Sequence, residues 1–538
     1  MLPEANFESE RNEPCRMDLK QNIIMLCRTY CGACIGVEVI SVTIEVYVTH
    51  GINFFLVGLP DSAVKESQQR ITTALSSIGA RIPGKKIVIN MAPADFRKEG
   101  SSFDLAIAVG ILAASGQYRF PSLGSYLIMG ELALDGSLRK IPGVLPIALH
   151  AKNEGFKGCI VPYDSAREIV EIAGISIYAV KSLTDVISVL EERGELLPFI
   201  PLPEIPRNSR STKEIPDFCD IKGQEFAKRG LEIAAAGGHN ILLCGGPGSG
   251  KSMMAKAFAG ILPPMSNDEA LETSVIYSVA GIFNQGRGLI RERPFRSPHH
   301  SSSVTAIAGG GAKALPGEIS LSHNGVLYLD ELSEFPRHIL ETLRQPLEDK
   351  CVTISRQRSK LTYPCNFMLV ASMNPCPCGY YGQPGDRCRC TSYSIFKYLS
   401  KISGPLLDRI DMHIEVSPVP ESLLLSDTKA EESREIRERV SRARNFQHER
   451  YGGRYGSNAM IGTVELSEYC KIGIDEKQFL ETVLKKLNLS ARAYSRILKV
   501  SRTIADLELS EFISLKHLSE AVLYRGIDRL YGYGESYF

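Results

Sequence analysis

The 538-residue sequence has no tryptophan and no long apolar run. A helix that crosses a bilayer needs about 20 consecutive apolar residues, and the best candidate, Leu105–Ala114, is roughly half that length. The N-terminal segment MLPEANFESERNEPCR carries acidic side chains and lacks the apolar core of a secretory signal. These absences predict a cytoplasmic protein, whose 14 cysteines we expect to be mostly thiols.

The sequence also lacks an excess of charge of either sign. Lysine and arginine number 62 against 61 for aspartate and glutamate, so the net charge is +1. This balance excludes a protein that binds nucleic acid through its overall charge, although local basic patches are compatible with it. Because 44% of the residues are hydrophobic and 23% are charged, we expect a folded globular chain rather than a disordered or disulfide-stapled one.

The length predicts three or four packed units. Residues 195–217 are rich in proline, which blocks helices and central strands, and they are predicted to form a linker. Residues 25–194 alternate β-type runs with helical patterns, which predicts an α/β domain. We expect residues 1–24 to be an irregular extension, and Met25 is an alternative start of the chain.

The segment that follows the linker shows two further patterns. Three short apolar runs, Asn240–Cys244, Gly325–Leu329 and Phe367–Ser372, predict a parallel sheet within a core of residues 218–418. Residues 419–538 show a 3.6-residue periodicity, which predicts an all-helical C-terminal domain.

An apolar run leads into a glycine-rich loop that matches G-x-x-x-x-G-K-S, and a helical pattern follows the loop. The glycines allow the backbone N–H groups to surround phosphates at the start of the helix. In this motif the lysine neutralises the β- and γ-phosphates and the serine hydroxyl binds Mg²⁺. The predicted nucleotide-binding residues are Gly245, Gly246, Pro247, Gly248, Ser249, Gly250, Lys251 and Ser252.

The two later strands deliver polar side chains to the same edge of the predicted sheet. Asp330 and Glu331 follow Gly325–Leu329, so we expect Asp330 to complete the Mg²⁺ shell and Glu331 to activate the attacking water. Asn374 follows the third strand and is expected to help position that water. Arg409 and Arg492 are candidate groups for stabilising γ-phosphate charge, because a neighbouring subunit often supplies such an arginine.

Two basic inserts interrupt the core. Lys350 to Tyr363 carries four cations and no acid, and its alternation predicts a β-hairpin with Arg356, Arg358 and Lys360 near the tip. Gly281 to His300 is also basic and contains Arg293 and Arg296. Basic loops suit a phosphate backbone bound without sequence readout, and the alternative is a pair of solvated hairpins with surface ion pairs.

Four cysteines form a CxC pair, Cys376 and Cys378, followed after nine residues by a second pair, Cys388 and Cys390. This pattern predicts a tetrahedral structural Zn²⁺ site, with reduced structural thiols or a redox switch as alternatives. Cys27, Cys31 and Cys34 lack a clear fourth ligand and are expected to be ordinary thiols. His299 and His300 are open to two interpretations, contact with the nucleotide or a neighbouring subunit and a structural hydrogen-bonding role.

The order of these motifs resembles that of the AAA+ ATPases. More narrowly, four segments resemble the magnesium-chelatase-like proteins of the ComM (YifB) type, namely RPFRSPHH, GEISLSHNGVLYLDELSEF, ASMNPCPCGYYG and LSARAYSRILKVSRTIADL. The resemblance extends over essentially all of the chain after about residue 25. It implies an AAA+ P-loop core of αβα type with a helical lid, ATP and Mg²⁺ as cofactors, Arg409 as a trans arginine finger and Arg492 as a sensor on the lid.

The same resemblance implies a hexameric DNA branch-migration helicase that acts in natural transformation. Its expected partners are single-stranded and branched DNA, with recombination proteins as further candidates. A repair or recombination role with the same chemistry would give the same sequence pattern. A chelatase subunit and a protein-remodelling ATPase are the two other functions to be weighed.

Gly130 through Pro162 resembles the proteolytic domain of Lon-type proteases, which implies a Lon-like N-terminal α/β domain. Ser102 falls where that family has its nucleophile, but Ile147 falls where it has the catalytic lysine. An isoleucine cannot accept a proton. We therefore expect this domain to be proteolytically inactive and to help build a ring or contact DNA.

Overall fold

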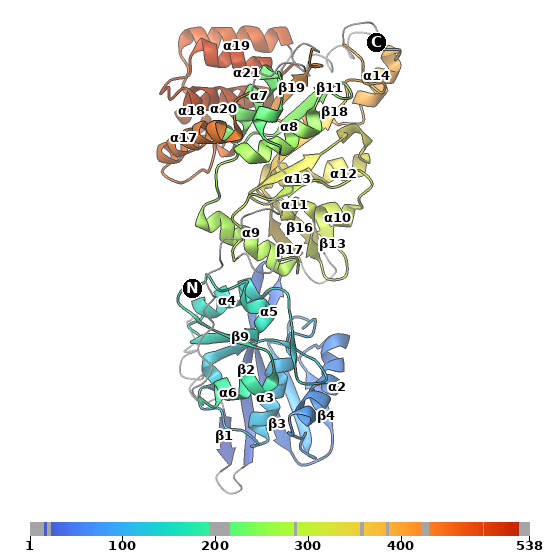
Figure 1. Cartoon of the computed structure of the whole chain (residues 1–538), viewed down its shortest axis with the longest axis vertical. Helices are drawn as coiled ribbons and strands as arrows, with labels where there is room; N and C mark the ends of the chain where they lie inside the picture. The colour runs from blue at the N-terminus through green and yellow to red at the C-terminus, as the bar shows by residue number, and fades with distance from the viewer. Residues whose placement is uncertain are drawn as a thin grey trace. The chain divides into compact units, whose positions relative to one another are not determined.

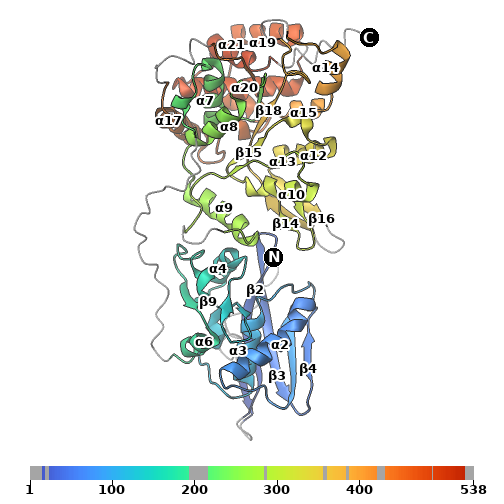
Figure 2. The ribbon, with the colours of Figure 1, turned by 45° about the vertical axis from the view of Figure 1, so that its right-hand side comes forward.

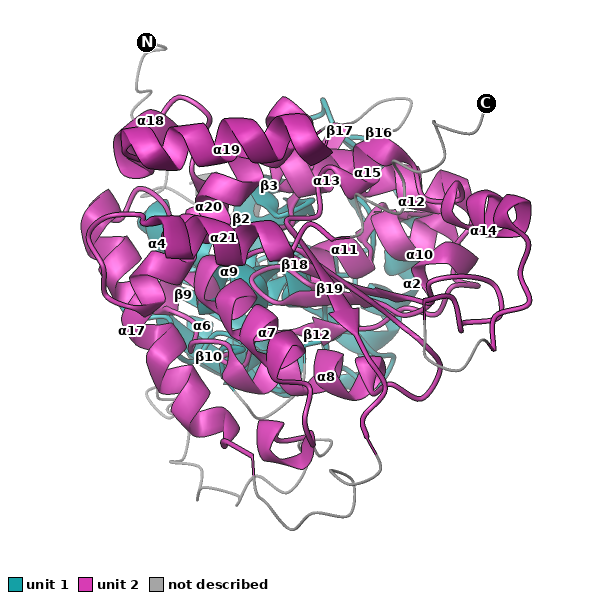
Figure 3. Ribbon diagram, turned by 90° about the horizontal axis from the view of Figure 1, so that it is seen from above, with its two compact units in different colours: residues 1–207, 270–290 teal, residues 208–269, 291–538 magenta. Residues whose placement is uncertain are grey.

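The computed structural model describes residues 15–18, 23–192, 216–283, 288–355, 360–382, 387–420, 430–487 and 489–526. The chain divides into two compact units, residues 1–207 with 270–290 (unit 1) and residues 208–269 with 291–538 (unit 2), which Figure 3 colours separately. No described helix is both long and apolar enough to cross a membrane.

Unit 1 is built on an eight-stranded mixed sheet (Figure 1). Its strands in spatial order are β10 (Ser176–Val180), β9 (Gly158–Pro162), β6 (Tyr126–Ile128), β2 (Ile23–Ile35), β3 (Glu38–Thr49), β5 (Lys86–Ala92) and β4 (Phe54–Val57), with β1 (Cys15–Asp18) paired to β2. The strands β7 (Glu131–Leu132) and β8 (Leu138–Arg139) form a separate hairpin. The helices are η1 (Leu123–Ser125), α2 (Ser62–Ser77), α3 (Asp104–Ala114), α4 (Val144–Asn153), α5 (Tyr163–Ala166) and α6 (Leu183–Leu190).

The expectation that residues 1–24 are irregular is wrong in part. Cys15–Asp18 forms β1, which pairs antiparallel with the first half of β2, and β2 itself begins at Ile23. The short strand is stabilised by pairing with a longer neighbour, an effect that local residue pattern does not reveal.

Helices cover both faces of the sheet in unit 1 (Figure 2). Thr29 of β2 donates to the Ala106 carbonyl of α3, and Gly32, three residues later in the strand, faces Ile147 of α4. Residues separated by three in a strand point to opposite faces, so α3 and α4 lie on different sides. The α/β character predicted for this domain is confirmed.

Unit 2 contains a five-stranded sheet in which every pair is parallel. Its strands in spatial order are β12 (Phe295–Arg296), β15 (Val326–Leu329), β18 (Met368–Met373), β11 (Ile241–Gly245) and β19 (Met412–Val416). Short two-stranded pairs lie outside this sheet, and these are β13 (Gly309–Gly310) with β14 (Leu315–Pro316) and β16 (Cys351–Ser355) with β17 (Lys360–Pro364). The parallel sheet and the β16–β17 hairpin both match the sequence-based expectation.

Alternate residues of these strands belong to different cores. Ile241 and Leu243 of β11 lie in one buried cluster, and Leu242 and Cys244 lie in another. Elements around the two faces are η2 (Phe218–Asp220), α7 (Glu225–Gly237), α8 (Lys251–Phe258), η3 (Ala259–Ile261), α10 (Val304–Ala308), α11 (Glu318–Leu321), η4 (Leu332–Glu334), α12 (Arg337–Thr342), α13 (Arg344–Asp349), α14 (Ser392–Leu399) and α15 (Gly404–Leu407). This is the αβα layering that the buried, non-alternating strands predict.

The C-terminal part of unit 2 is helical, as expected. It contains α17 (Ser433–Tyr451), η5 (Asn458–Met460), α18 (Leu466–Tyr469), α19 (Ile474–Leu487), α20 (Ala491–Leu507) and α21 (Leu515–Leu523). Their apolar side chains, such as Val440 and Ile504, share a core with Ile241 and Leu243 of the sheet. The helix α9 (Asn267–Val279) starts in unit 2, and its residues from Ala270 onward belong to unit 1.

Candidate nucleotide site

The phosphate loop lies between β11 and α8. β11 is buried along its whole length and ends at Gly245, and α8 begins at Lys251. Gly248 and Gly250 adopt φ values of +74° and +89°, which side chains other than glycine rarely tolerate. The predicted strand, loop and helix are therefore present in this order, with the loop at the carboxyl edge of the sheet.

Lys251 and Asn374 meet inside this loop. The Lys251 ammonium donates to the Gly245 and Gly246 carbonyls at 2.7 and 2.8 Å and to Asn374 Oδ1 at 3.2 Å. Burial lowers the pKa of Lys251 because it disfavours the charged form, and nearby carboxylates oppose this shift. The ammonium is thus held at the centre of the loop, where it can pair with phosphate oxygens.

Ser252 and Asp330 form the predicted metal-binding pair. The Ser252 hydroxyl donates to Asp330 Oδ2 at 3.0 Å, and Ser372 Oγ donates to Asp330 Oδ1. Burial opposes ionisation of Asp330, but hydrogen bonds from Ser372, Tyr328 and Ser252 outweigh it and lower the pKa of this carboxyl. A hydroxyl beside an ionised carboxylate is the oxygen donor set that Mg²⁺ prefers, so these residues fit the ion.

Glu331 is placed differently from its neighbour. Its backbone has φ +51°, and its N–H group is fixed by Asp330 Oδ1 at 3.1 Å and Ser372 Oγ at 3.3 Å. The side chain remains 59% exposed. A fixed backbone with a free carboxylate suits a residue that must accept a proton from water at the sheet edge.

Two partners of these carboxylates were not assigned from the sequence. Ser372 bridges Asp330 and the Glu331 backbone, and its only sequence signal is a polar residue within an apolar strand. His300 Nδ1 lies 4.0 Å from Glu331 Oε2, and its ring packs on His299 with centroids 4.0 Å apart. Of the two interpretations left open for the histidines, this position favours proximity to the nucleotide.

The two candidate arginines lie away from the phosphate loop of their own chain. Arg409 precedes β19, whose first residue pairs with Ile241 at the start of β11. Its guanidinium contacts Glu348 at 2.7 Å and the Pro405 carbonyl at 2.6 Å, and the side chain is only 8% exposed. Gly245 lies at the other end of β11, roughly 15 Å from the edge near Arg409 at ~3.3 Å per residue. Arg409 therefore lies far from the site that it was expected to serve, within one chain.

Arg492 is exposed in the first turn of α20. One turn later, Arg496 contacts Asp411 Oδ1 at 2.7 Å, at the same amino edge of the sheet as Arg409. Among the described residues no ion pair holds the Arg492 guanidinium. The helix is thus anchored at the edge opposite the phosphate loop, and its arginine is available to another molecule.

The side chains predicted to contact nucleic acid fall into three groups, namely those held in ion pairs, those outside the described residues and one that is exposed. Arg293 donates to Glu269 at 2.9 Å and to the Pro263 carbonyl at 2.7 Å, and Arg296 forms two hydrogen bonds with Glu318. Both guanidinium groups therefore support the fold, as the ion-pair alternative predicts. Arg356 and Arg358 lie outside the described residues, and Lys360 is exposed at the start of β17.

The four-cysteine cluster assembles as predicted. The sulfur atoms of Cys376, Cys378, Cys388 and Cys390 all lie within 4.8 Å of one another. Cys31 and Cys34, which are expected to be ordinary thiols, lie outside this cluster. Burial raises the pKa of each to about 12. With their pKa raised this far, these two thiols are protonated near neutral pH.

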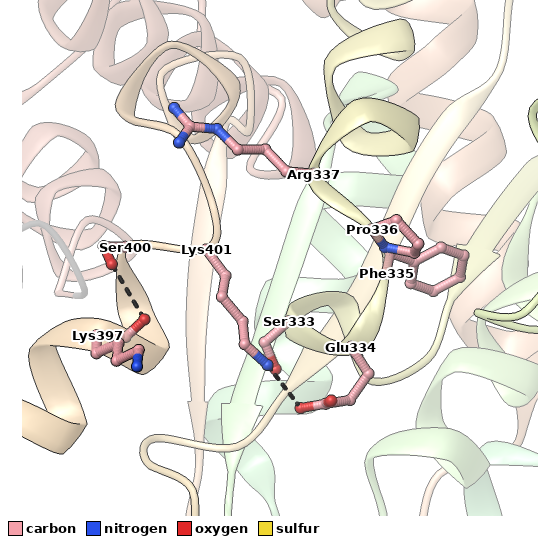
Figure 4. A pocket seen from close by; sticks show the side chains of 8 residues that line it. All are labelled: Ser333, Glu334, Phe335, Pro336, Arg337, Lys397, Ser400 and Lys401. Carbon is pink, nitrogen blue, oxygen red and sulfur yellow. Dashed lines mark hydrogen bonds and ion pairs between the residues drawn. The ribbon is translucent and has the colours of Figure 1, made fainter.

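A cavity of about 470 Å³ is lined by residues that follow Glu331 in the sequence and by residues of α14 and the segment after it (Figure 4). Glu334, Lys401 and Lys397 are among the residues that line it, and Lys401 Nζ contacts Glu334 Oε1 at 3.4 Å. No phosphate-loop residue borders this cavity. The nucleotide site is thus defined by its backbone loop and carboxylates rather than by this pocket.

Unit 1 contains both positions that were matched to the catalytic residues of Lon-type proteases. Ser102 lies just before α3, and Ile147 is buried in α4, where it packs against Gly32 and is 3% exposed. Ile147 offers no proton acceptor at the position where Lon-type enzymes have their lysine, so an inactive peptidase domain stays a prediction that rests on this residue.

Comparison with known proteins places this site in a family. Family models described as magnesium chelatase subunit ChlI match residues 44–165 and 217–424, and a model of its C-terminal region matches residues 430–525. The chain is 45% identical over 503 residues to the YifB protein of Salmonella typhimurium, covering 93% of this chain and 96% of the relative. The chain belongs to the magnesium-chelatase-like AAA+ proteins of the ComM (YifB) type.

Other relatives support the same family and the resemblance to Lon-type proteases. The competence protein ComM of Haemophilus influenzae is 45% identical over 511 residues, which is 94% of this chain and 98% of the relative. Lon protease 2 of Bacillus subtilis is 33% identical over 127 residues, 23% of this chain and 22% of the relative, which bears out the Lon resemblance. Family membership implies ATPase activity, with ATP and Mg²⁺ as cofactors.

Proposed function

We propose that this protein is an ATP-hydrolysing ring motor that binds DNA and promotes branch migration or unwinding in homologous recombination during natural transformation. The observation that supports a ring is that the predicted site residues belong to two opposite edges of the sheet. The phosphate loop, the Mg²⁺ pair and Glu331 lie at the carboxyl edge, whereas Arg409 and Arg496, which is one helical turn after Arg492, lie at the amino edge. A second subunit, in a homo-hexamer, would bring an arginine to this site.

Each residue then has a defined task. Lys251 and the loop N–H groups hold the phosphates, and Ser252 with Asp330 holds Mg²⁺, which supplies charge neutralisation when bound. Glu331 accepts the proton of the attacking water, and Asn374, which already bonds Lys251, positions that water or the γ-phosphate. The proposed substrate is cytoplasmic DNA, either single-stranded or branched. Recombination proteins are the proposed partners, and the cysteine cluster is the proposed Zn²⁺ site.

Two observations support DNA as the polymer. In the sequence Arg356 and Arg358 fall between β16 and β17, and Lys360 is exposed as the first residue of β17, in a chain whose net charge is only +1. The ComM relative of Haemophilus influenzae carries the name of a competence protein. Binding confined to a basic hairpin fits contact with phosphates rather than with bases.

Steady-state ATPase measurements test the function. We expect turnover to rise with single-stranded or branched DNA, and the stimulated rate to vanish in Glu331→Gln. Stimulation by an unfolded protein alone would favour a remodelling ATPase and reject the DNA motor. A rate that responds to neither polymer would favour the chelatase-like alternative. This alternative is supported by 27% identity over 164 residues with a magnesium-chelatase subunit of Chlorobaculum parvum.

The hairpin has its own test. Replacing Arg356, Arg358 and Lys360 together by alanine should weaken single-strand binding and lower its salt slope by roughly 2, at about 0.7 per phosphate contact. The matched control replaces three exposed cations of the helical region, Arg434, Lys485 and Lys486. Equal salt slopes for the two triple variants would reject the hairpin as the DNA contact.

A further inference from the structure

The four-cysteine cluster brings together two short pairs on one loop. Cys376 Sγ lies 3.3 Å from Cys378 Sγ and 3.8 Å from Cys388 Sγ, and the Cys378 and Cys388 sulfurs are 3.6 Å apart. Cys390 completes the group within 4.8 Å. All four are free thiols, so no disulfide accounts for their proximity.

These separations select a single metal ion. Four sulfurs at ~2.3 Å from a tetrahedral centre lie about 3.8 Å from one another, close to the separations found here. An iron–sulfur cluster places several metal atoms between its cysteines and holds their sulfurs farther apart. A set of four thiolates with no oxygen or imidazole ligand suits Zn²⁺.

The local backbone is shaped for this purpose. Gly379 and Gly382 adopt φ values of +84° and +75°, so the chain can turn back after the first pair. The Gly379 N–H group donates to the Cys376 carbonyl at 3.0 Å, and the Tyr381 N–H group points at Cys376 Sγ at 3.4 Å. Such N–H groups stabilise a negatively charged thiolate.

The cysteine loop also touches the nucleotide site. Cys376 follows Asn374 by two residues, and Asn374 Oδ1 accepts from Lys251. On its other side, Gly379 packs so closely on the phosphate loop that an added Cβ would lie 2.6 Å from Pro247 Cδ. The loop therefore borders the phosphate loop at a point where only a glycine fits.

We propose that the four-cysteine cluster binds one Zn²⁺ and that the metal-bound loop positions the phosphate loop through the Gly379–Pro247 contact. The zinc fixes the position of Cys376 and Cys378, and Gly379, the next residue, transmits this position to Pro247. The metal has no part in the hydrolysis step. The inference does not require DNA to be the substrate, because its readouts are metal content and nucleotide affinity.

Metal analysis of the purified full-length chain tests the first part. We expect one equivalent of zinc per chain, less than about a tenth of that in Cys388→Ser/Cys390→Ser, and full occupancy in the control Cys219→Ser, whose cysteine lies outside the cluster. Cobalt substitution should give the intense visible bands of a tetrahedral thiolate site. A wild-type chain that neither contains zinc nor takes it up overturns the metal site, and so does zinc retained by the double variant.

A matched pair of glycine variants tests the second part. Gly379→Ala and Gly382→Ala impose the same unfavourable φ, but a Cβ at Gly382 meets nothing within 4 Å. We expect both to retain zinc, and only Gly379→Ala to weaken binding of a fluorescent ATP analogue, by roughly tenfold, because misplacement by about 1 Å is costly in such sites. If Gly379→Ala does not fold, Pro247→Ala removes the contact from the other side and should give the same loss. Affinity equal to that of Gly382→Ala overturns the positioning role.

Discussion

At the scale of single residues, Asp330 and Glu331 show how adjacent carboxylates acquire different tasks. Asp330 is held by three hydroxyl-bearing side chains, whereas the Glu331 carboxylate is exposed and lies 4.0 Å from His300 Nδ1. A carboxylate with its oxygens already bonded is suited to a fixed ion. A carboxylate left free at the sheet edge is suited to proton transfer.

The exposed position of Glu331 leads to a prediction. Glu331→Gln keeps the shape of the side chain but cannot accept a proton, so ATP hydrolysis should fall by about 100-fold or more. Nucleotide affinity should stay close to that of the wild type. Steady-state turnover and the Kd of a fluorescent ATP analogue measure the two quantities. Glu334→Gln, at an exposed acid on η4, is the control, and hydrolysis by Glu331→Gln at the control's rate would contradict the assignment.

Asp411 connects a single side chain to pH. Burial opposes its ionisation, but Arg496 at 2.7 Å, the buried His239 and the Asn240 N–H group outweigh burial and hold its pKa well below the usual range. A carboxyl with a lowered folded-state pKa stabilises the fold above its unfolded pKa of about 3.9, and this contribution is lost as the pH falls further.

Asp411→Asn should therefore lower the thermal unfolding midpoint at pH 7. The free energy of unfolding should fall by about 3 kcal/mol, the cost of breaking a buried ion pair. The difference between variant and wild type should shrink as the pH is lowered from 5 to 3. Calorimetry at matched pH values measures it. A difference that stays constant over this range would show that Asp411 acts through packing rather than charge.

At the scale of elements, the sequence predicts the long periodic segments closely. The C-terminal domain expected from its helical periodicity contains the 17-residue helix α20, and the expected strand Gly325–Leu329 is observed as Val326–Leu329. β12 and β19 were not identified, because β12 has two residues and β19 carries His413 and Glu415 among its apolar residues. Both strands depend on pairing with a neighbour that is distant in sequence, which local pattern does not reveal.

The same limit applies to the site. The phosphate loop and the carboxylates follow from motif and strand order, because parallel strands end at one edge. Ser372 and His300 do not, because their contacts depend on strand register and on the path of a loop. The position of α20 also required the structure, because nothing in its own sequence indicates that Arg496 reaches Asp411.

The placement of α20 predicts complementation between subunits. If Arg492 acts on a neighbour's ATP, a ring that mixes Glu331→Gln chains with Arg492→Ala chains contains some sites with both groups intact. The mixture should regain ATPase activity, about a quarter of the wild-type rate for random equal mixing if sites act independently. Each variant alone should be inactive. A mixture no more active than its two components would show that Arg492 does not act in trans.

At the scale of the whole molecule, near-neutral charge acquires a structural explanation. Arg293 and Arg296 of one basic segment are neutralised by Glu269 and Glu318, so they do not add to a positive surface. The segment from Lys350 to Tyr363, which contains most of the β16–β17 hairpin, has a local charge of +4 in sequence, and the Lys360 side chain is exposed. Of the two basic inserts, the proposed DNA contact therefore rests on the segment from Lys350 to Tyr363 rather than on Arg293 and Arg296.

The chain passes between the two units more than once. Residues 270–290 belong to unit 1, although residues 208–269 and 291–538 on either side belong to unit 2. Phe283 lies in the core of unit 1, and Leu271, Val275, Tyr277, Leu289 and Ile290 pack against that core. Ser278 supports this packing by donating to the buried Glu168 carboxylate at 2.8 Å. The proline-rich segment 195–217 is consequently one of several covalent connections.

Cutting within residues 195–217 should therefore not separate the chain into independent parts. With a protease site inserted at the unit boundary near residue 207, the two fragments should co-elute under native conditions, because 270–290 supplies a piece of the unit 1 core. Phe283→Asp, combined with Ser278→Asp beside Glu168, places charge in that core and should release the fragments. The uncut double variant, run on the same column, controls for loss of folding. Immediate separation of the wild-type fragments would show that residues 270–290 contribute little to holding unit 1 together.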